Sequence, residues 1–423
     1  MIKLGHDQIR AGTPLPFDCY DGQGRLLLKN GTIVESQKQV DFLLERGLFS
    51  ISVPERDSKA ELSIERTISP FQLLNEYYAR LEHLLLSSEQ TIRAFHEEAA
   101  ASTATPSATQ QLGIFLEGKT ASTKGSSREK SQPFPQQILQ LARDIQAMCQ
   151  LDADAVLGAI HLGNTSGSYS ISHALNRAAV CELLAMRRGI PERNRRQLIA
   201  AALTCDLSMR QLQDELTCQE EPLRPEQQQA ITEHPHETVK LLAALGAIDP
   251  SWTNAVAQHH EFPDGNGYPA GLSGTVISPW ARILRLADTY TAMLSPRAYR
   301  KAMLSKAVLR QLFVRRGGEF DEDLAVFFMK ELGIFPPGLF VKLQSGELAI
   351  VIRRSPNPRA PLVKVIIGPR GATLEQPIPR QTDVREYEII DVVERPSFLA
   401  DIDQHRLWDY DIQSSCFVSG TLN

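Results

Sequence analysis

The chain has 423 residues, a length that favours about two to four domains. Hydrophobic residues make up 42% and charged residues 22% of it, an ordinary balance for globular domains. The net charge is −5, which argues against a broad basic surface for nucleic acid or a membrane. We find no apolar run of the ~20 residues that a bilayer requires and no apolar signal-peptide core at the start. We therefore expect a cytoplasmic protein.

Residues 1–55 are predicted to form a small α+β domain. The segments PFDCY and RLLLK are typical of short strands, and the turn DGQG joins them. A helix with Val40 and Leu44 on one face follows, and LFSISV is expected to close the sheet. The pattern indicates no chemistry in this domain.

Residues 56–135 are predicted to hold a long helix and a flexible insertion. The pair Ser69-Pro70 favours a helix start, because serine caps free amides and proline suits the first helical turn. Residues 100–132 are rich in Ser, Thr, Ala, Gln and Lys and have few large apolar side chains. That composition is typical of a linker.

Residues 136–335 show apolar side chains every three to four positions, which predicts helices. The breaker cluster FPPG at 335–338 ends this pattern. The segments FVKLQSGELAIVIRR and PLVKVIIG then predict a small β domain at 336–400, followed by a tail at 401–423. The expected fold is mainly α: a helical bundle flanked by a small α+β domain and a small β domain.

Histidines gather in the helical region, where six of the ten lie between residues 161 and 260. The sharpest segment is HHEFPDGNGYP, from His259 to Pro269. His260 lies four residues after the apolar Val256, so its imidazole is expected to face the core and to need a partner there. A metal ion is one candidate partner.

The segment resembles the HHE…DGxGYP signature of the HD-GYP family, which belongs to the HD superfamily. Other landmarks fall at the places where that family has them. His234-Pro235 resembles its HP motif, His173 lies 32 residues before Cys205-Asp206, and Asp288 in RILRLADTY resembles its late aspartate. Arg297 and Arg300 in PRAYR resemble a pair that holds a nucleotide phosphate.

The resemblance implies metal-assisted hydrolysis of cyclic di-GMP in a helical HD-type bundle. Family members hold two or three iron or manganese ions, which activate a water for attack on a phosphodiester. Tyr268, Arg297 and Arg300 are then expected to bind the nucleotide, with Asp206 as the catalytic carboxylate. The expected ligands of a binuclear iron or manganese site are His173, Asp206, His234, His259, His260 and Asp288.

The chain departs from the family pattern where the HDxGK stretch is expected. Asp206 is present, but Cys205 stands for the histidine, Ser208 for the glycine and Met209 for the lysine. One imidazole fewer leaves a metal short of a ligand, and Met209 has no charge to offer a transition state. Tyr169 stands where three-metal members have a glutamate, so a third metal is not expected.

Each candidate also has a plainer interpretation. The histidines and Asp288 are then former ligands that bond one another, and His234 is an exposed residue at a helix start, as His236 and Glu237 are. Cys205 is a small buried residue of the helical stretch LIAAALTC, which is the interpretation favoured here. Tyr268 shapes its turn, and the two arginines are surface cations.

Three functional hypotheses remain open. The favoured one is a cyclic di-GMP signalling protein that is weak or inactive as a phosphodiesterase and acts by binding the nucleotide or another signalling protein. The alternative is an active metal-dependent phosphodiesterase that produces linear dinucleotide or GMP. The third is a scaffold, which the HHE and GYP segments argue against. We expect Cys205→His with Met209→Lys to raise activity where the rest of the site is intact.

Overall fold

A computed structural model describes residues 69–88, 92, 132–163, 167–396, 399 and 402–410, together with short stretches of the first 50 residues. The chain divides into two compact units, Met1–Ile68 with Asp411–Asn423, and Ser69–Tyr410. The predicted insertion lies almost wholly outside the described residues, as does the tail beyond Tyr410.

The first unit contains the predicted α and β elements. Its antiparallel sheet has the strand order β1-β4-β2-β3, formed by Ile2–Lys3, Phe49–Ser50, Cys19–Tyr20 and Leu26–Leu28. Helix α1 spans Gln37–Glu45 and buries Val40, as the apolar spacing predicts. The turn at residues 21–24 lies outside the described residues.

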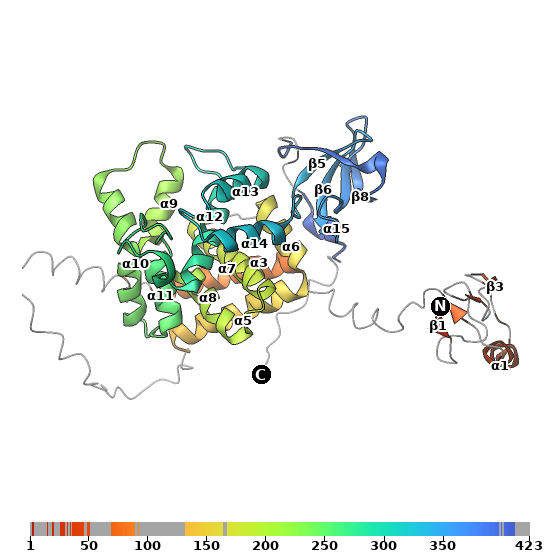
Figure 1. Ribbon diagram of the computed structural model, residues 1–423, viewed down its shortest axis with the longest axis horizontal. Coiled ribbons are helices and arrows are strands. Elements are labelled where there is room, and N and C mark those ends of the chain that lie inside the picture. Colours follow the sequence, from red (N-terminus) through yellow and green to blue (C-terminus); the bar gives the residue numbers. More distant parts are fainter. Residues whose placement is uncertain are drawn as a thin grey trace, which may run out of the picture. The chain divides into compact units, whose positions relative to one another are not determined.

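Helix α3 spans Pro70–Ser87 and opens the second unit (Figure 1). Ser69 accepts a hydrogen bond from the Gln72 backbone, and the Gln72 side chain accepts one from the Ser69 backbone, so two of the free amides at this end are satisfied. The predicted helix start at Ser69-Pro70 is thus confirmed.

The helices that follow form one bundle around a shared core. They are α5 (Phe134–Leu151), α6 (Ala153–Leu162), α7 (Tyr169–Arg187), α8 (Glu192–Thr204), α9 (Arg210–Cys218), α10 (Pro225–Ala244), α11 (Pro250–Gln258), α12 (Pro279–Leu294), α13 (Ser305–Val314) and α14 (Glu322–Leu332). The prediction of a mainly helical region is confirmed.

Helix α7 is the central helix of this bundle, since nearly all of its side chains are buried. It packs against α8 and α12. Its polar residues His173, Arg177 and Glu182 are therefore removed from water. Buried polar groups need partners within the protein, so α7 is a natural support for a polar site.

The β strands predicted after residue 335 are confirmed, and they form a five-stranded antiparallel sheet of order β8-β7-β6-β5-β9. Its strands are β5 (Phe340–Leu343), β6 (Leu348–Arg353), β7 (Leu362–Ile367), β8 (Thr373–Gln381) and β9 (Ile389–Val392). The sheet and the helices α9 to α11 lie at opposite ends of the second unit (Figure 1). The segment assigned to a tail instead contains helix α15, Gln404–Trp408, which packs on the sheet.

The sheet is fixed to α6 by close packing and by ion pairs. A Cβ atom at Gly158 would lie 2.3 Å from the Trp408 ring, so only glycine allows this approach. Arg353 pairs with Asp152, and Arg354 pairs with Asp154 at 2.6 Å. The sheet and the helices therefore form one compact unit rather than two separate domains.

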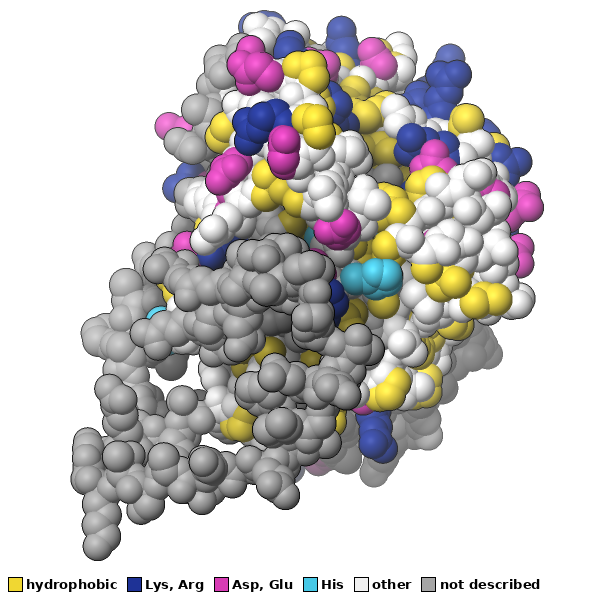
Figure 2. Space-filling view, turned by 90° about the vertical axis from the view of Figure 1, so that its left-hand side faces the viewer, with side chains coloured by type: hydrophobic (Ala, Val, Ile, Leu, Met, Phe, Trp, Pro, Cys, Tyr) yellow, Lys and Arg dark blue, Asp and Glu magenta, His cyan; other side chains and the backbone are white. Residues whose placement is uncertain are grey.

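The surface of the molecule carries charges of both signs. On the face that Figure 2 shows, the described acidic and basic side chains are interspersed rather than gathered by sign. Among the described residues, none of the helices combines the length and apolarity needed to cross a membrane.

Candidate metal centre

His234 lies in the interior of α10 and is 2% exposed. The plainer interpretation of His234, an exposed histidine at a helix start, is therefore wrong, as is the helix start expected at His236 and Glu237, because α10 begins nine residues earlier, at Pro225. Pro235 has no N–H, so the Ile231 carbonyl lacks its usual helical donor. The His234 Nδ1 bonds this carbonyl at 2.6 Å. A carbonyl only accepts, so Nδ1 carries the proton and Nε2 keeps a free lone pair.

His259 follows the last turn of α11, where helix carbonyls need outside partners. Its Nδ1 bonds the Val256 carbonyl at 2.7 Å, so Nδ1 again carries the proton. The side chain is fully buried. Burial lowers the pKa of His259, which favours the neutral ring with its lone pair on Nε2.

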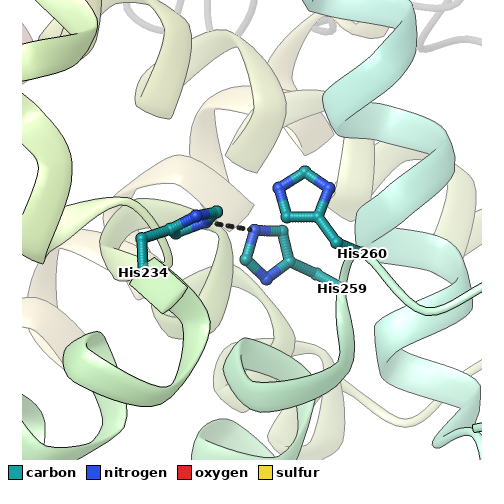
Figure 3. Close-up of side chains that lie close together, drawn as sticks. All are labelled: His234, His259 and His260. Carbon is teal, nitrogen blue, oxygen red and sulfur yellow. Dashed lines mark hydrogen bonds between the residues drawn. The ribbon is translucent and has the colours of Figure 1, made fainter. Parts of the chain in front are cut away.

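The Nε2 atoms of His234 and His259 face each other (Figure 3). The Nε2 atoms of His234 and His259 are 3.2 Å apart, and Asp206 Oδ1 lies 3.4 Å and 3.8 Å from them. Three acceptors thus converge without a proton between them. Two ligands at right angles and about 2.1 Å from one metal ion lie about 3.0 Å apart, so the arrangement fits a divalent cation.

His260 completes this group, since its ring nitrogen lies within 4.8 Å of those of His234 and His259. Its ring centre is 4.1 Å from that of His259. Burial, followed by the neighbouring His259 and His234, holds the pKa of His260 well below its usual value. A neutral imidazole is the form that binds a metal.

The GYP turn folds back on the end of α11 and brings Tyr268 over the histidines. A Cβ atom at Gly267 would lie 2.3 Å from the Phe262 nitrogen, so the turn requires glycine there. The Tyr268 N–H donates to the His260 carbonyl at 3.1 Å, and its ring stacks on the His260 ring with centres 4.6 Å apart. Glu261 is buried and accepts from the backbone of Ala270 and Leu272 at 2.7 Å and 2.8 Å.

Asp206 joins the histidines to a buried arginine. Its Oδ2 accepts from Arg177 at 2.5 Å and from Gln213 at 3.1 Å, while its Oδ1 faces His234 and His259. Burial would raise the pKa of Asp206, but the Arg177 guanidinium outweighs burial and holds the pKa well below its usual value. The carboxylate is therefore charged.

Asp288 on α12 binds the same arginine. Its Oδ1 accepts from Arg177 at 2.7 Å and from the His173 Nε2 at 2.9 Å. Burial would raise the pKa of Asp288, but the hydrogen bond with His173 and the charge of Arg177 hold it below its usual value. Ligand atoms of His173, Asp206 and Asp288 lie within 4.8 Å of one another, so they form a second group with metal-ligand spacing.

Tyr169 and Arg297 cover His173. The Tyr169 ring stacks on that of His173 with centres 5.2 Å apart, and the Arg297 guanidinium lies 4.4 Å above the Tyr169 ring. Arg297 also donates to the Tyr169 hydroxyl at 2.5 Å. Tyr169 thus supplies a ring and a hydroxyl where the family pattern has a carboxylate.

Cys205 is fully buried at the end of α8, as the plainer interpretation of the sequence has it. Burial raises the pKa of its thiol well above the usual value, so the thiol is neutral. Its Sγ lies within 4.8 Å of ligand atoms of Asp206 and His259. A neutral thiol is a poor metal ligand, because metals bind the thiolate.

A cavity of about 520 Å³ opens above the two groups, within the usual range for small-molecule sites. Among the predicted site residues, those lining it are His173, Asp206, His234, His260, Tyr268, Asp288 and Arg297, and Met209 lines it too. His259 lies beneath it. Arg300 is not among the lining residues: its guanidinium donates to the Ala292 and Ser295 carbonyls at the end of α12.

The sequence interpretation missed two residues of this site. Arg177 was noticed only as a neighbour of His173, because its partners lie 29 and 111 residues away. Glu261 is the glutamate of the HHEFPDGNGYP segment, but no role was predicted for it. A signal existed for Arg177, since it is a charged residue within the apolar pattern of residues 171–185 and such a residue needs a partner.

Comparison with known proteins identifies residues 163–324 as an HD domain. A cyclic di-GMP phosphodiesterase of Pseudomonas aeruginosa is 28% identical over 242 residues, which are 57% of this chain and 57% of that protein. The cyclic di-GMP phosphodiesterase PdeB of Borreliella burgdorferi is 26% identical over 48% of this chain and 53% of that protein. The 3'3'-cGAMP-specific phosphodiesterase 3 of Vibrio cholerae is 27% identical over 40% of this chain and 36% of that protein.

Residues 163–324, within the helical region, thus match the HD domain family. The predicted resemblance to its HD-GYP members is confirmed. The chain spans about half or less of the length of these curated relatives.

Proposed function

We propose that this protein is a cyclic di-GMP signalling protein that binds the nucleotide through a divalent metal ion and hydrolyses it slowly or not at all. The observation that carries the proposal is the convergence of Asp206, His234 and His259 on one point, without a donor, at the floor of the 520 Å³ cavity. A divalent ion bound there would contact a phosphate oxygen and lower the pKa of its water.

The charges of the cavity support a need for that ion. The carboxylates of Asp206, Glu220, Glu221 and Asp288 line it, against one lining arginine, Arg297. Cyclic di-GMP carries two phosphate charges, so this lining alone would repel it. Asp206 and Asp288 are offset in part by Arg177 behind them. A bound divalent ion would turn the remaining repulsion into attraction at the phosphate.

The proposal of slow hydrolysis rests on the residues at 205 and 209. Cys205 holds a neutral, buried thiol where the family pattern has an imidazole. Met209 lines the cavity where the pattern has a lysine, so no ammonium group faces the phosphate there. Catalytic groups act as units, and the loss of two members is expected to cost most of the rate.

The test measures binding and turnover on one preparation. The full chain, purified without oxygen and loaded with manganese or ferrous ion, is titrated with cyclic di-GMP by calorimetry, and products are separated by chromatography. We expect binding that disappears on chelation, and little linear dinucleotide or GMP over a long incubation. The nucleotide 3'3'-cGAMP, which appears in the name of one relative, is added as a competitor. It tests which of the two nucleotides the protein prefers.

Two variants separate the possible results. His260→Ala should abolish metal-dependent binding, whereas His236→Ala, an exposed histidine on α10, should not. Turnover that His260→Ala abolishes would support the alternative, an active phosphodiesterase. Metal-loaded, folded protein that binds neither nucleotide would contradict the proposal. The cytoplasmic location and a role for protein partners stay predictions.

A further inference from the structure

Arg177 occupies one half of the candidate centre. Its Nη1 lies 2.5 Å from Asp206 Oδ2 and 2.7 Å from Asp288 Oδ1, so one nitrogen bridges the two carboxylates. Its Nε donates to the Ala202 carbonyl at 2.9 Å, which fixes the plane of the guanidinium. The side chain is 1% exposed and lies on the central helix α7.

We propose that the Arg177 guanidinium is a built-in cation that replaces a second metal ion, so that this centre takes one divalent ion and not two. The single ion lies at His234, His259, His260 and Asp206 Oδ1. Asp288 holds the arginine and His173 bonds Asp288, so neither of them is a metal ligand. The inference rests on the proposed metal site and contradicts the binuclear site that the family resemblance implies.

Distance gives the first argument. A metal ion bound to Asp206 Oδ2 and Asp288 Oδ1 needs about 2.0–2.2 Å to each oxygen. Nη1 of Arg177 already lies 2.5 Å from Asp206 Oδ2 and 2.7 Å from Asp288 Oδ1. An ion in the same place would overlap the nitrogen, and an ion beside it would meet a positive charge a few ångströms away in a buried setting, which is strongly repulsive.

Charge gives the second argument. Asp206 and Asp288 are the two carboxylates among the groups of ligand atoms around this centre. Arg177 already offsets one of their two charges. One divalent ion then leaves a single positive charge for a phosphate to neutralise, while a second ion would leave three. Buried charge without a counter-charge is costly, so the arginine makes a second ion unfavourable.

The residue at position 205 also fits a centre with one divalent ion. Its thiol is fully buried beside Asp206 and His259, in a place where an imidazole needs more room. A metal ligand at position 205 would not bring in a second ion while Arg177 occupies the adjoining half of the candidate centre. The pair Cys205→His and Met209→Lys is therefore not expected to restore a second ion while Arg177 is present.

The test counts metal ions per chain. The full chain is dialysed to equilibrium against manganese and analysed for metal, as wild type, Arg177→Met and Arg195→Met. Arg195 is the matched control, because it too is buried and paired with a buried carboxylate, that of Glu182, but does not line the cavity. We expect one ion in wild type, two in Arg177→Met and one in Arg195→Met. The melting temperature of Arg177→Met should also rise more on adding manganese than that of wild type.

Asp288→Asn gives a second measurement if Arg177→Met does not fold. We expect it to keep the one ion, since Asp288 holds the arginine, and loss of the ion would overturn the inference. Two ions in wild type would overturn it and leave the proposed function standing. No ion in wild type would refute the proposed metal site; Arg177→Met would then still decide whether the arginine fills a place that a metal can take.

Discussion

Glu261 shows how a single buried carboxylate shapes the wall of the candidate pocket. It accepts two backbone N–H groups, from Ala270 and Leu272, on the far side of the GYP turn. These bonds close the turn against the end of α11, and the turn in turn sets the Tyr268 ring on His260. Glu261 therefore acts on the pocket through the loop and not through contact with a ligand.

Glu261→Gln is expected to loosen this loop. The amide offers one oxygen and one NH₂ group, so one backbone N–H would face a donor instead of an acceptor. A buried donor left without its acceptor costs about 1–3 kcal/mol. We expect a lower free energy of unfolding by about that amount, and weaker binding of cyclic di-GMP, measured by urea titration and calorimetry.

Asp264→Asn is the control in the same loop. Asp264 is exposed and accepts from the Asn266 backbone at 2.9 Å, a bond that the oxygen of asparagine keeps. It should leave both stability and binding close to wild type. Equal effects of the two substitutions would show that any charge lost from the loop matters, and the proposed role of Glu261 would be wrong.

The residues that the sequence predicts well are those tied to a local pattern. His259, His260 and Tyr268 come together because a single turn carries them. Arg177 could not be assigned, because its partners Asp206, just after α8, and Asp288, on α12, reach it through the packing of the whole bundle. Arg300 was expected to bind phosphate, yet its guanidinium bonds the end of its neighbouring helix.

At the scale of elements, α10 contains a proline that a helix interior normally disfavours. Pro235 leaves the Ile231 carbonyl for the His234 side chain, which fixes the ring with Nε2 towards the centre. The helix thus lacks one backbone hydrogen bond, and the freed carbonyl orients the ring of a candidate ligand. This accounts for the His-Pro pair in physical terms.

Pro235→Ala should stabilise the protein and weaken metal binding. Alanine restores the N–H that competes for the Ile231 carbonyl, and a proline in a helix interior costs up to about 3 kcal/mol. Loss of a partner that orients a histidine ligand typically lowers metal affinity about 10- to 100-fold. We expect a higher melting temperature of the metal-free protein and a weaker manganese affinity, measured by scanning calorimetry and equilibrium dialysis.

Pro225→Ala on the same helix is the comparison. Pro225 is in the first turn, where the missing N–H has no helical partner in any case. Pro225→Ala should therefore change neither the melting temperature of the metal-free protein nor its manganese affinity by much. An unaltered metal affinity in Pro235→Ala would mean that other contacts hold the His234 ring. The proposed role of Pro235 in orienting that ring would then be wrong.

Helix starts were predicted best where a cap and a proline coincide, as at Ser69-Pro70. They were predicted worst within α10, where Pro235 resembles a boundary but lies in the middle of the helix. Local chemistry fixes the first case. In the second, the packing of α10 against α11 and the bond from His234 compensate for the proline, and neither is visible in a local pattern.

At the scale of the whole molecule, the C-terminal sheet is anchored to the helices that carry the candidate centre. Trp408 packs on Gly158 of α6, and its indole N–H donates to the Ile352 carbonyl at 3.0 Å. The sequence placed Trp408 in a tail, because a five-residue helix has too few positions for a periodic pattern. The contact depends on a distant partner and could not be seen locally.

His161 links α6, α12 and the segment that leads to the sheet. Its Nδ1 donates to the Pro337 carbonyl at 2.6 Å, and its Nε2 accepts from the Tyr290 hydroxyl at 2.5 Å. Both bonds suit the neutral ring. Burial lowers the pKa of His161 from 6.5 to about 4.

The stability of the protein should therefore fall on acidification. The unfolded chain takes up the His161 proton near pH 6.5, while the folded chain takes it up only near pH 4. The contribution is complete above pH 6.5 and is lost as the pH falls from 6.5 towards 4, by at most about 3 kcal/mol. His161→Gln keeps a donor and an acceptor but does not titrate, so its free energy of unfolding should fall less over this range.

The measurement is a series of urea titrations between pH 7 and pH 4.5 on wild type, His161→Gln and His236→Gln. The last is the control, since His236 is exposed on α10 and its replacement should leave the pH slope of wild type. Other histidines titrate in all three proteins, so the difference in slope isolates His161. If His161→Gln has the slope of wild type, the acid sensitivity belongs to the histidines of the metal centre, and the link between helices and sheet does not respond to pH.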